Sequence, residues 1–271
     1  MNGVVQTATA KTKERQKVWL SSLFFLVAFL LFWQLSTKPS VGGRTEGLPG
    51  PLAVAERVWE MVSDPFYDRG ANDKGIGIQL LYSLGRLAVG YTAASLIAIF
   101  FGVVLGLYPT LLRAVNPYIQ VLKPISPLAW MPLFLYSIKN SAWAAVMVVF
   151  MSSIWPTLAN TAFGVSSIKR DYLNVSSLLQ LSWFRCFFKV ILPAAAPAIV
   201  AGLRISIGGA WIAIVAAEML IGGTGIGYFV WNEWNNLQLT SVISAILTIG
   251  TVGVLLDAGF ARLAKKLSYT E

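Results

Sequence analysis

Few side chains in this 271-residue sequence are suited to catalysis. It has no histidine and one cysteine, Cys186, which excludes histidine-based acid–base catalysis, His-ligated zinc or haem, and an intrachain disulfide. Glu218 and Asp257 stand in apolar stretches but are far apart in the sequence. The glycine-rich run GGTGIG at 222–227 lacks the Lys-Ser/Thr ending of a phosphate-binding loop, so we interpret it as a turn. We predict no catalytic residue, metal site or cofactor, and no ATP hydrolysis by this chain.

Two basic side chains also stand among apolar residues. Lys123 precedes a proline-rich stretch, and Arg204 is surrounded by small and aliphatic residues. An unpaired charge at the middle of a bilayer costs about 2.5–3.5 kcal/mol on insertion scales, so in a membrane each cation needs a partner or water. Two interpretations stay open. Each cation either reaches the membrane surface or pairs with Asp257 or Glu218, or it lines a route for a polar solute.

The composition indicates a membrane protein. Hydrophobic residues make up 56% of the chain, charged residues only 12%, and the mean hydropathy is +0.66. An ordinary soluble domain carries about 25% charged residues. So much apolar sequence needs lipid, because one aqueous core cannot hide it. We therefore expect an all-α integral membrane protein.

Five apolar runs are long enough to cross a hydrocarbon core of about 30 Å as helices. They are 18–36, 87–108, 142–158, 194–221 and 240–260. The first follows a basic tail, as the core of a secretory signal would. It is longer than such a core and lacks a small-x-small cleavage site, so we expect an uncleaved anchor.

A sixth apolar run, 114–137, contains four prolines that remove backbone donors and should kink or break a helix. Broken backbone at membrane depth is tolerated only against protein or a wet cavity. The run is therefore either a kinked packing helix or a helix that lines a pathway, and we favour the second.

The basic residues predict the orientation of six crossings. With the N-terminus inside, twelve Lys and Arg fall in inside segments and six in outside segments, in accord with the positive-inside rule. Both termini are then cytoplasmic. The excess positive charge lies on the cytoplasmic side, and no basic patch interleaved with aromatic residues is present, so nucleic-acid binding is not expected.

We divide the chain accordingly. The parts are a cytoplasmic tail (1–17), an anchor helix (18–36), an outer segment (37–77), a core of five crossings (78–261) containing an inner loop (166–193), and a cytoplasmic tail (262–271). The outer segment contains an amphipathic pattern from Pro51 that the Asp64-Pro65 step ends. That helix lies at the interface or contacts an external partner. In the core, a small residue at every fourth position from Gly90 to Gly106 predicts close packing against another helix.

The inner loop 166–193 contains two short helical patterns. The first places Tyr172 and Val175 on one face. The second begins after Ser182, a candidate N-cap, and repeats Phe184, Phe187 and neighbouring apolar residues at helical spacing, with basic residues opposite. Physical reasoning leaves two alternatives: a helix lying on the leaflet, or a helix docking in the groove of a partner.

The stretch NVSSLLQLSWFRCFFKVILPAAAPAIVAGLRIS resembles the cytoplasmic coupling loop of permease subunits of binding-protein-dependent ABC importers. Leu192-Pro193 and the alanines after it match the family pattern. The usual Glu-Ala-Ala falls on Asn174, Val175 and Ser176, and the usual Gly falls on Gln180, so the first half of the motif is degenerate. KPISPLAWMPL, WIAIVAAEML and GGTGIGYFVW resemble the nitrate, sulfonate, taurine and bicarbonate branch, and most of all cyanobacterial nitrate permeases.

This resemblance implies a type I (MetI-like) permease fold with six transmembrane helices in a bacterial inner membrane. It also implies a second copy of the chain, two cytoplasmic ATP-binding subunits, and a periplasmic or lipid-anchored solute-binding protein as partners. The residues expected to contact the ATPase are Tyr172, Asn174, Ser176, Gln180, Ser182, Phe184, Arg185, Phe187, Phe188 and Lys189. ATP-driven closure would then rock the helices between inward-open and outward-open states.

A permease of this branch carries a small anion by alternating access, so its pathway needs a few donors or positive charges that do not trap the ion. The candidates are Lys123, Ser126, Trp130 and Arg204. We expect nitrate and nitrite, with bicarbonate or an alkanesulfonate such as taurine as alternatives. A stand-alone channel or secondary transporter is the alternative class, but no internal duplication of the spans supports it.

Overall fold

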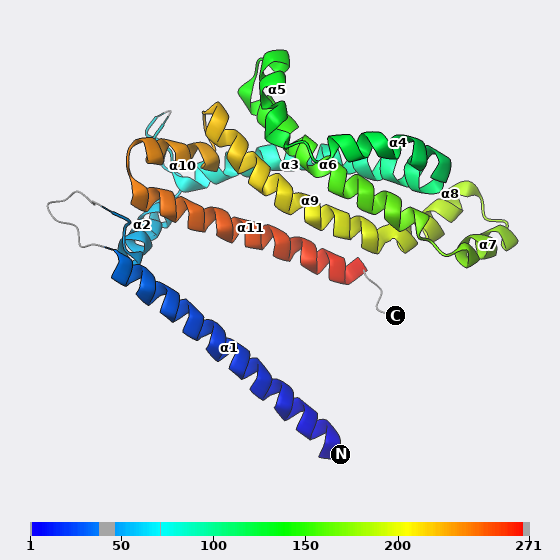
Figure 1. Cartoon of the computed structure of the whole chain (residues 1–271), viewed down its shortest axis with the longest axis horizontal. Coiled ribbons are helices and arrows are strands. Elements are labelled where there is room, and N and C mark those ends of the chain that lie inside the picture. The colour runs from blue at the N-terminus through cyan, green and yellow to red at the C-terminus, as the bar shows by residue number, and fades with distance from the viewer. Residues whose placement is uncertain (1, 38–46, 71, 268–271) are drawn as a thin grey trace.

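The computed structural model describes residues 2–37, 47–70 and 72–267 and places most of them in helices (Figure 1). The helices are α1 (Asn2–Ser36), α2 (Pro51–Ser63), α3 (Ile76–Leu107), α4 (Pro109–Leu122), η1 (Pro127–Trp130), α5 (Met131–Ile138), α6 (Ser141–Ser166), α7 (Arg170–Leu178), α8 (Trp183–Cys186), η2 (Phe187–Ile191), α9 (Leu192–Ile221), α10 (Ile226–Asn235) and α11 (Leu239–Leu267). Within these ranges there is no strand beyond an isolated bridge, so the expected all-α class is confirmed. Parts of the predicted outer segment and C-terminal tail, 38–46 and 268–271, lie outside the described residues.

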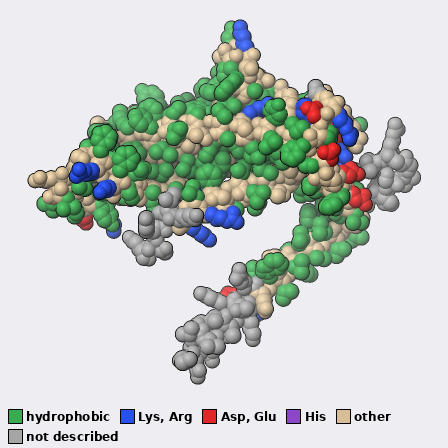
Figure 2. Space-filling view, turned by 180° about the vertical axis from the view of Figure 1, so that it is seen from behind, with side chains coloured by type: hydrophobic (Ala, Val, Ile, Leu, Met, Phe, Trp, Pro, Cys, Tyr) green, Lys and Arg blue, Asp and Glu red, His purple; other side chains and the backbone are tan. Residues whose placement is uncertain are grey.

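Five stretches of the described chain are long and apolar enough to cross a membrane. They are 16–36 within α1, α3, α6, the continuous helix formed by α8, η2 and α9, and α11. Four of them contain a predicted run in full, and α3 contains 87–107 of the run 87–108. A broad apolar belt covers the length of the bundle, and the charged side chains gather toward its two ends (Figure 2). This distribution is that of a protein whose middle lies in hydrocarbon.

The sixth predicted run is broken at its prolines. α4 and the η1–α5 segment meet at 84°, and together they count as a crossing only if the bent pair is taken as one span. Pro124 and Pro127 cannot donate the backbone bonds that would continue α4, and residues 127–130 form a 3₁₀ turn instead. A single straight helix over 114–137 is therefore not formed, and α5 stands out from the bundle (Figure 1).

Helix α3 packs against α6 along its stripe of small residues, as predicted. A Cβ atom added at Gly102 would lie 2.6 Å from the Cβ of Thr161, and one added at Gly106 would lie 2.6 Å from the Cβ of Val165. A Cβ atom added at Gly90 would lie 2.6 Å from the backbone carbonyl oxygen of Val146 in α6. The stripe lets the two backbones approach and supplies the van der Waals contact that holds helices together in lipid.

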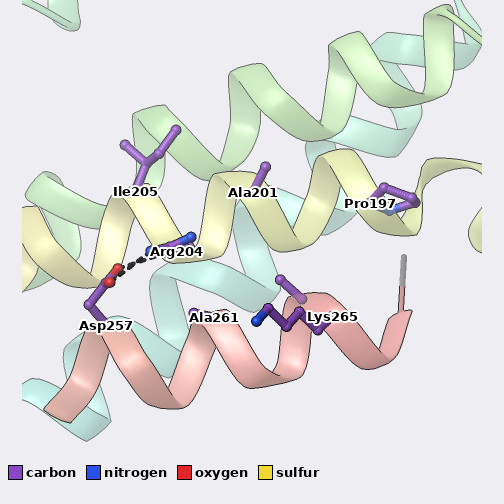
Figure 3. Close-up of a pocket in the computed structure, with 8 residues that line it drawn as sticks. Pro197, Ala201, Arg204, Ile205, Asp257, Ala261 and Lys265 are labelled. Carbon is purple, nitrogen blue, oxygen red and sulfur yellow. Dashed lines mark hydrogen bonds and ion pairs between the residues drawn. The ribbon is translucent and has the colours of Figure 1, made fainter. Parts of the chain in front are cut away.

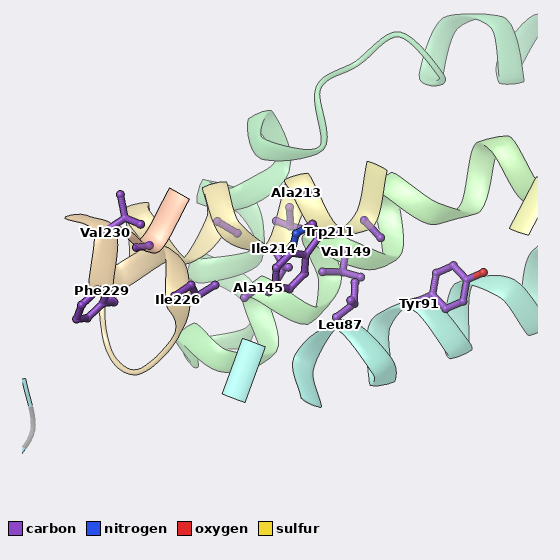
Figure 4. Close-up of a cluster of buried hydrophobic side chains, with 14 of the residues drawn as sticks. Leu87, Tyr91, Ala145, Val149, Trp211, Ala213, Ile214, Ile226, Phe229 and Val230 are labelled. Atoms are coloured by element: carbon purple, nitrogen blue, oxygen red, sulfur yellow. The ribbon is translucent and has the colours of Figure 1, made fainter. Parts of the chain in front are cut away.

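The centre of the bundle lies where α3, α6, α9 and α10 meet. Leu87, Val149, Ile214 and Ile226 are buried there, one from each of these helices (Figure 4). Trp211 of α9 joins them and donates its indole N–H to the carbonyl of Ile249 in α11 at 3.0 Å. α11 is thereby attached to the face of α9 that α6 leaves free.

The amphipathic helix of the outer segment is α2, which begins at Pro51 and ends before Asp64 as predicted. Its buried residue Val54 packs at α11, where Ser244 donates to the Val54 carbonyl at 3.4 Å. Arg57 donates to the Ser241 hydroxyl at 3.0 Å. Val54 and Met61 are thus buried, whereas Leu52 and Val62 of the same helix stay exposed. We call the end of the bundle formed by α2, α10 and the loop 222–225 the α10 end, and the opposite end the α7 end.

Candidate functional site

The α7 end carries large apolar side chains that no part of the described chain covers. We call them the apolar patch: Tyr172, Val175, Leu178, Leu179, Trp183, Phe184 and Phe188. Each is at least half exposed. An apolar cluster of this kind on a protein surface marks a contact with a partner or a membrane.

The turn between α7 and α8 sets the direction of one helix of the apolar patch relative to the other. α7 ends at Leu178 with Leu179 as its C-cap, and Gln180 follows with φ of 49°, in the left-handed region. The Gln180 N–H bonds the carbonyl of Ser177 at 3.0 Å, and the Leu181 N–H bonds that of Ser176 at 3.1 Å. A residue with a Cβ is disfavoured in this conformation, which explains why the family pattern has Gly where this chain has Gln180.

The second helix of the patch does not have the single aromatic face that its spacing predicts. Residues 187–191 form a π-helix, in which the Leu192 N–H bonds the carbonyl of Phe187. Pro193 causes this wide turn, since it has no N–H to bond Lys189 and its ring crowds that carbonyl. Phe184 and Phe188 are exposed, whereas Phe187 packs against a buried cluster.

The residues expected to contact the ATPase fall into two groups. Exposed are Tyr172, Asn174, Gln180, Ser182, Phe184, Arg185, Phe188 and Lys189. Ser176 is instead buried, with the thiol of Cys186 3.4 Å from its hydroxyl, and Phe187 is half-buried. Ser182 takes the extended backbone of an N-cap, but its side chain makes no capping hydrogen bond.

A groove between α9 and α11 holds the second candidate site (Figure 3). Arg204 donates from Nε and from a terminal nitrogen to the two carboxylate oxygens of Asp257, both at 2.7 Å. The side chains stay 45% and 54% exposed, and the groove, about 520 Å³ in volume, continues to Lys265. The pairing with Asp257 is one of the partners that the sequence offered for Arg204.

The other three pathway candidates lie at the break between α4 and α5. Lys123 caps α4 and is exposed, and Ser126 precedes the 3₁₀ turn and is exposed as well. Trp130 is half-buried and stacks on Phe134 with the ring centres 6.5 Å apart. These three residues lie along the break between α4 and α5, whereas Arg204 lies in the groove between α9 and α11.

A buried polar network at the α10 end fixes the glycine-rich loop. Glu218 is fully buried, accepts from Arg86 at 2.8 Å and from Ser83 at 2.7 Å, and also accepts from the Gly227 N–H at 3.2 Å. Gln79 accepts from the Gly225 N–H at 2.6 Å. The loop is therefore a structural turn held on α3, which agrees with its interpretation as a turn and with a structural role for Glu218.

Sequence reasoning missed three members of this network: Gln79, Ser83 and Arg86. Their spacing of four and three residues places them on one face of α3, which was the available signal. What that face would meet could not be read from the sequence. The loop that it binds lies more than 130 residues away in the chain.

The turn between α2 and α3 is charged and lies outside the spans. Lys74 donates to Asp68 and lowers the pKa of that carboxyl group below its ordinary value. Burial raises the pKa of the neighbouring Tyr67 phenol, and the carboxylate of Asp73 adds to this effect. The backbone N–H of Gly75 bonds the Tyr67 carbonyl at 2.8 Å, so the same turn sets the start of α3.

Comparison with known families and relatives places the chain clearly. The model described as "Binding-protein-dependent transport system inner membrane component" matches residues 79–269. A nitrate import permease protein of Synechocystis sp. is 42% identical over 238 residues, covering 88% of this chain and 85% of that protein. A bicarbonate transport system permease protein of the same organism is 41% identical over 261 residues, covering 93% and 92%.

More distant likenesses extend the same pattern. A taurine transport system permease protein of Escherichia coli is 27% identical over 253 residues, covering 93% of this chain and 90% of that protein. Among solved structures, an inward-facing MetNI methionine ABC transporter matches with a TM-score of 0.56 at 14% identity, covering 80% of this chain and 97% of that one. The structural likeness establishes the fold, which agrees with the expected MetI-like class.

Proposed function

Because this chain belongs to the family of binding-protein-dependent transport system inner membrane components, we propose that it is the transmembrane subunit of an ATP-driven importer of a small inorganic anion. The main support for this function is the similarity of the chain, over most of its length, to nitrate and bicarbonate permeases. Nitrate is the first candidate substrate, and bicarbonate and taurine are the alternatives that relatives provide.

The α7 end is proposed to be the cytoplasmic docking site of the ATP-binding subunits. The apolar patch supports this, since seven exposed apolar side chains next to Arg185 and Lys189 suit a protein groove better than water. Movement of α7 and α8 would pass directly into α9, because α8, η2 and α9 form one continuous helix. This continuity makes rigid-body rocking of the bundle a natural consequence of ATPase closure.

The remaining partners follow from the same arrangement. The α10 end would face outward and receive anion from a solute-binding protein. The exposed helices α4 and α5 leave room for a second copy of the chain. With the α7 end inside, both termini are cytoplasmic, and the chain crosses a bacterial plasma membrane several times.

Reconstitution tests this function directly. The chain is expressed with the ATP-binding and solute-binding proteins encoded beside it, and the purified complex is placed in proteoliposomes. We expect uptake of labelled nitrate that requires ATP and the binding protein, with weak competition from taurine. Nitrate flux without ATP would indicate a channel or secondary transporter, and uptake of bicarbonate but not nitrate would assign the other substrate.

A further inference from the structure

The ion pair between Arg204 and Asp257 is open to a groove although both residues lie within spanning helices. Each side chain is about half exposed, and the two hydrogen bonds between them are 2.7 Å long. Asp257 lies ten residues before the end of α11, or about 15 Å along the helix. Charges at such depth face a bundle interior or a water-filled cavity, because hydrocarbon does not solvate them. The groove therefore faces water or a second copy of the chain.

This pair differs from the one between Arg86 and Glu218. Glu218 is fully buried and accepts additional bonds from Ser83 and from Gly227 in the fixed loop, so that pair is part of the packing. Among the described residues, Asp257 accepts hydrogen bonds only from Arg204, and the groove lies beside both side chains. If another anion replaced Asp257 at Arg204, Asp257 would lose no other hydrogen bond among the described residues.

The geometry of the pair also defines what can replace Asp257. A guanidinium fork binds two oxygens of a planar group in its own plane. A carboxylate is such a group, and so are nitrate, nitrite and bicarbonate. Chloride offers a single centre, so it cannot supply this pair of acceptors.

We propose that Asp257 is an exchangeable internal ligand of Arg204, which a planar oxyanion displaces during transport. This role rests on the proposed transport function and deepens it by naming the selective group. When the site is empty, the carboxylate neutralises the guanidinium. When the anion arrives, it takes over the fork, and the returning carboxylate expels it. Transport requires such binding, strong enough for entry and weak enough for release.

Lys265 gives the released anion a next position. It lines the same groove eight residues after Asp257, about 12 Å farther along α11 in the direction of its C-terminal end (Figure 3). No salt bridge to Lys265 occurs among the described residues. A second cation at that distance attracts the anion away from Arg204 toward the α7 end.

Direct binding tests the exchange without a solute-binding protein, whose own affinity would mask it. The full-length chain is purified in nanodiscs with whatever ATPase subunits accompany it. Binding of labelled nitrate is measured by equilibrium dialysis, with bicarbonate and chloride as competitors. We expect Asp257→Asn to bind nitrate about tenfold more tightly, equivalent to about 1.4 kcal/mol, because the competing carboxylate is gone. Arg204→Lys, which keeps the charge but loses the fork, should lose the preference for nitrate and bicarbonate over chloride.

Two further variants separate exchange from a structural role. Arg204→Gln with Asp257→Asn keeps a neutral hydrogen-bonded pair, so it should fold and bind nitrate at least about tenfold more weakly than the wild type. Glu60→Gln breaks the exposed pair with Arg57 in α2 and should leave nitrate affinity unchanged. Unchanged affinity in Asp257→Asn or in the neutral pair would overturn the exchange.

The result is independent of the transport experiment. ATP-driven nitrate uptake together with unchanged binding in Asp257→Asn would reject the exchange and leave the proposed function standing. Tighter binding in Asp257→Asn together with nitrate flux that needs no ATP would support the exchange and reject the importer.

Discussion

At the scale of single residues, Glu218 shows how a buried charge can be structural. It accepts from Arg86 and Ser83 of α3 and from a glycine N–H of the loop that follows its own helix. Removing one member of a buried pair leaves an uncompensated charge, which typically costs about 3–5 kcal/mol. The network therefore fixes the α10 end, whereas the open pair at Arg204 is free to exchange.

We predict that Arg86→Met destabilises the protein by about 3–5 kcal/mol, because Glu218 stays buried without its cation. Thermal unfolding of the purified chain in detergent measures this loss. Arg86→Met combined with Glu218→Gln should lose less stability than Arg86→Met alone, since no buried charge remains. The control Glu60→Gln, which breaks only the exposed ion pair with Arg57, should change stability by about 1 kcal/mol or less. A double variant less stable than the single one would contradict this account.

The left-handed residue between α7 and α8 gives a prediction of the opposite sign. Gln180→Gly should stabilise the protein by about 1 kcal/mol, because glycine adopts φ of 49° without the clash of a Cβ atom. Gln180→Ala keeps the Cβ and should give no comparable gain. Both are measured by the same unfolding assay, and equal stability of the two variants would show that the backbone at this turn is not strained.

At the scale of helices, the contact between α3 and α6 depends on small residues at particular positions. Gly102→Leu should destabilise the protein by about 1–3 kcal/mol, because a Cβ alone would lie 2.6 Å from Thr161. Gly85 is the matched control on the same helix, since open space surrounds it. Gly85→Leu should be neutral or stabilising, because glycine is a poor helix former. Equal losses of stability in the two leucine variants would show that the close contact at Gly102 is not responsible.

The helices also show what sequence can and cannot predict. Pro124 and Pro127 predicted the break in the sixth run, and Pro51 predicted the start of α2, because proline acts on the local backbone. The helical spacing of the aromatics after Ser182 was misleading. Phe184 and Phe188 are exposed, whereas Phe187 is half-buried, and residues 187–191 form a π-helix just before Pro193. Patterns counted at 3.6 residues per turn fail wherever the turn itself changes.

The two candidate sites could be predicted to different degrees, because one is built from a single local segment and the other from two helices far apart in the sequence. The apolar patch follows from local spacing in one segment, so its location was evident from the sequence. The pairing of Arg204 with Asp257 joins residues 53 positions apart, and the sequence offered two carboxylates without a choice between them. Residues that meet only because separate helices pack together cannot be paired from the sequence, so their pairing is known only from the structure.

At the scale of the whole molecule, the two ends of the bundle differ in a way that suits opposite roles. The α10 end is locked, because the loop 222–227 is tied to α3 and α2 is tied to α11. The α7 end presents exposed apolar side chains on short helices that run into α9. An end with unsatisfied apolar surface is where a further subunit adds most to stability. The motor of an importer would therefore be expected at the α7 end.

The apolar patch gives the last prediction. Phe184→Ala combined with Phe188→Ala should reduce copurification of the ATP-binding subunits at least about tenfold, because both rings are exposed and central aromatic contacts often contribute about 2 kcal/mol or more. Phe100→Ala is the control, since Phe100 is equally exposed but lies on α3 within a span, where lipid covers it.

Phe187→Ala separates docking from packing. This ring is half-buried, so the variant should lower the stability of the chain itself more than its affinity for the ATPase. Pull-down from detergent and unfolding of the free chain measure the two effects. Full copurification of the double variant would mean that the patch faces lipid, and the leaflet-bound helix would then be the better description of α8.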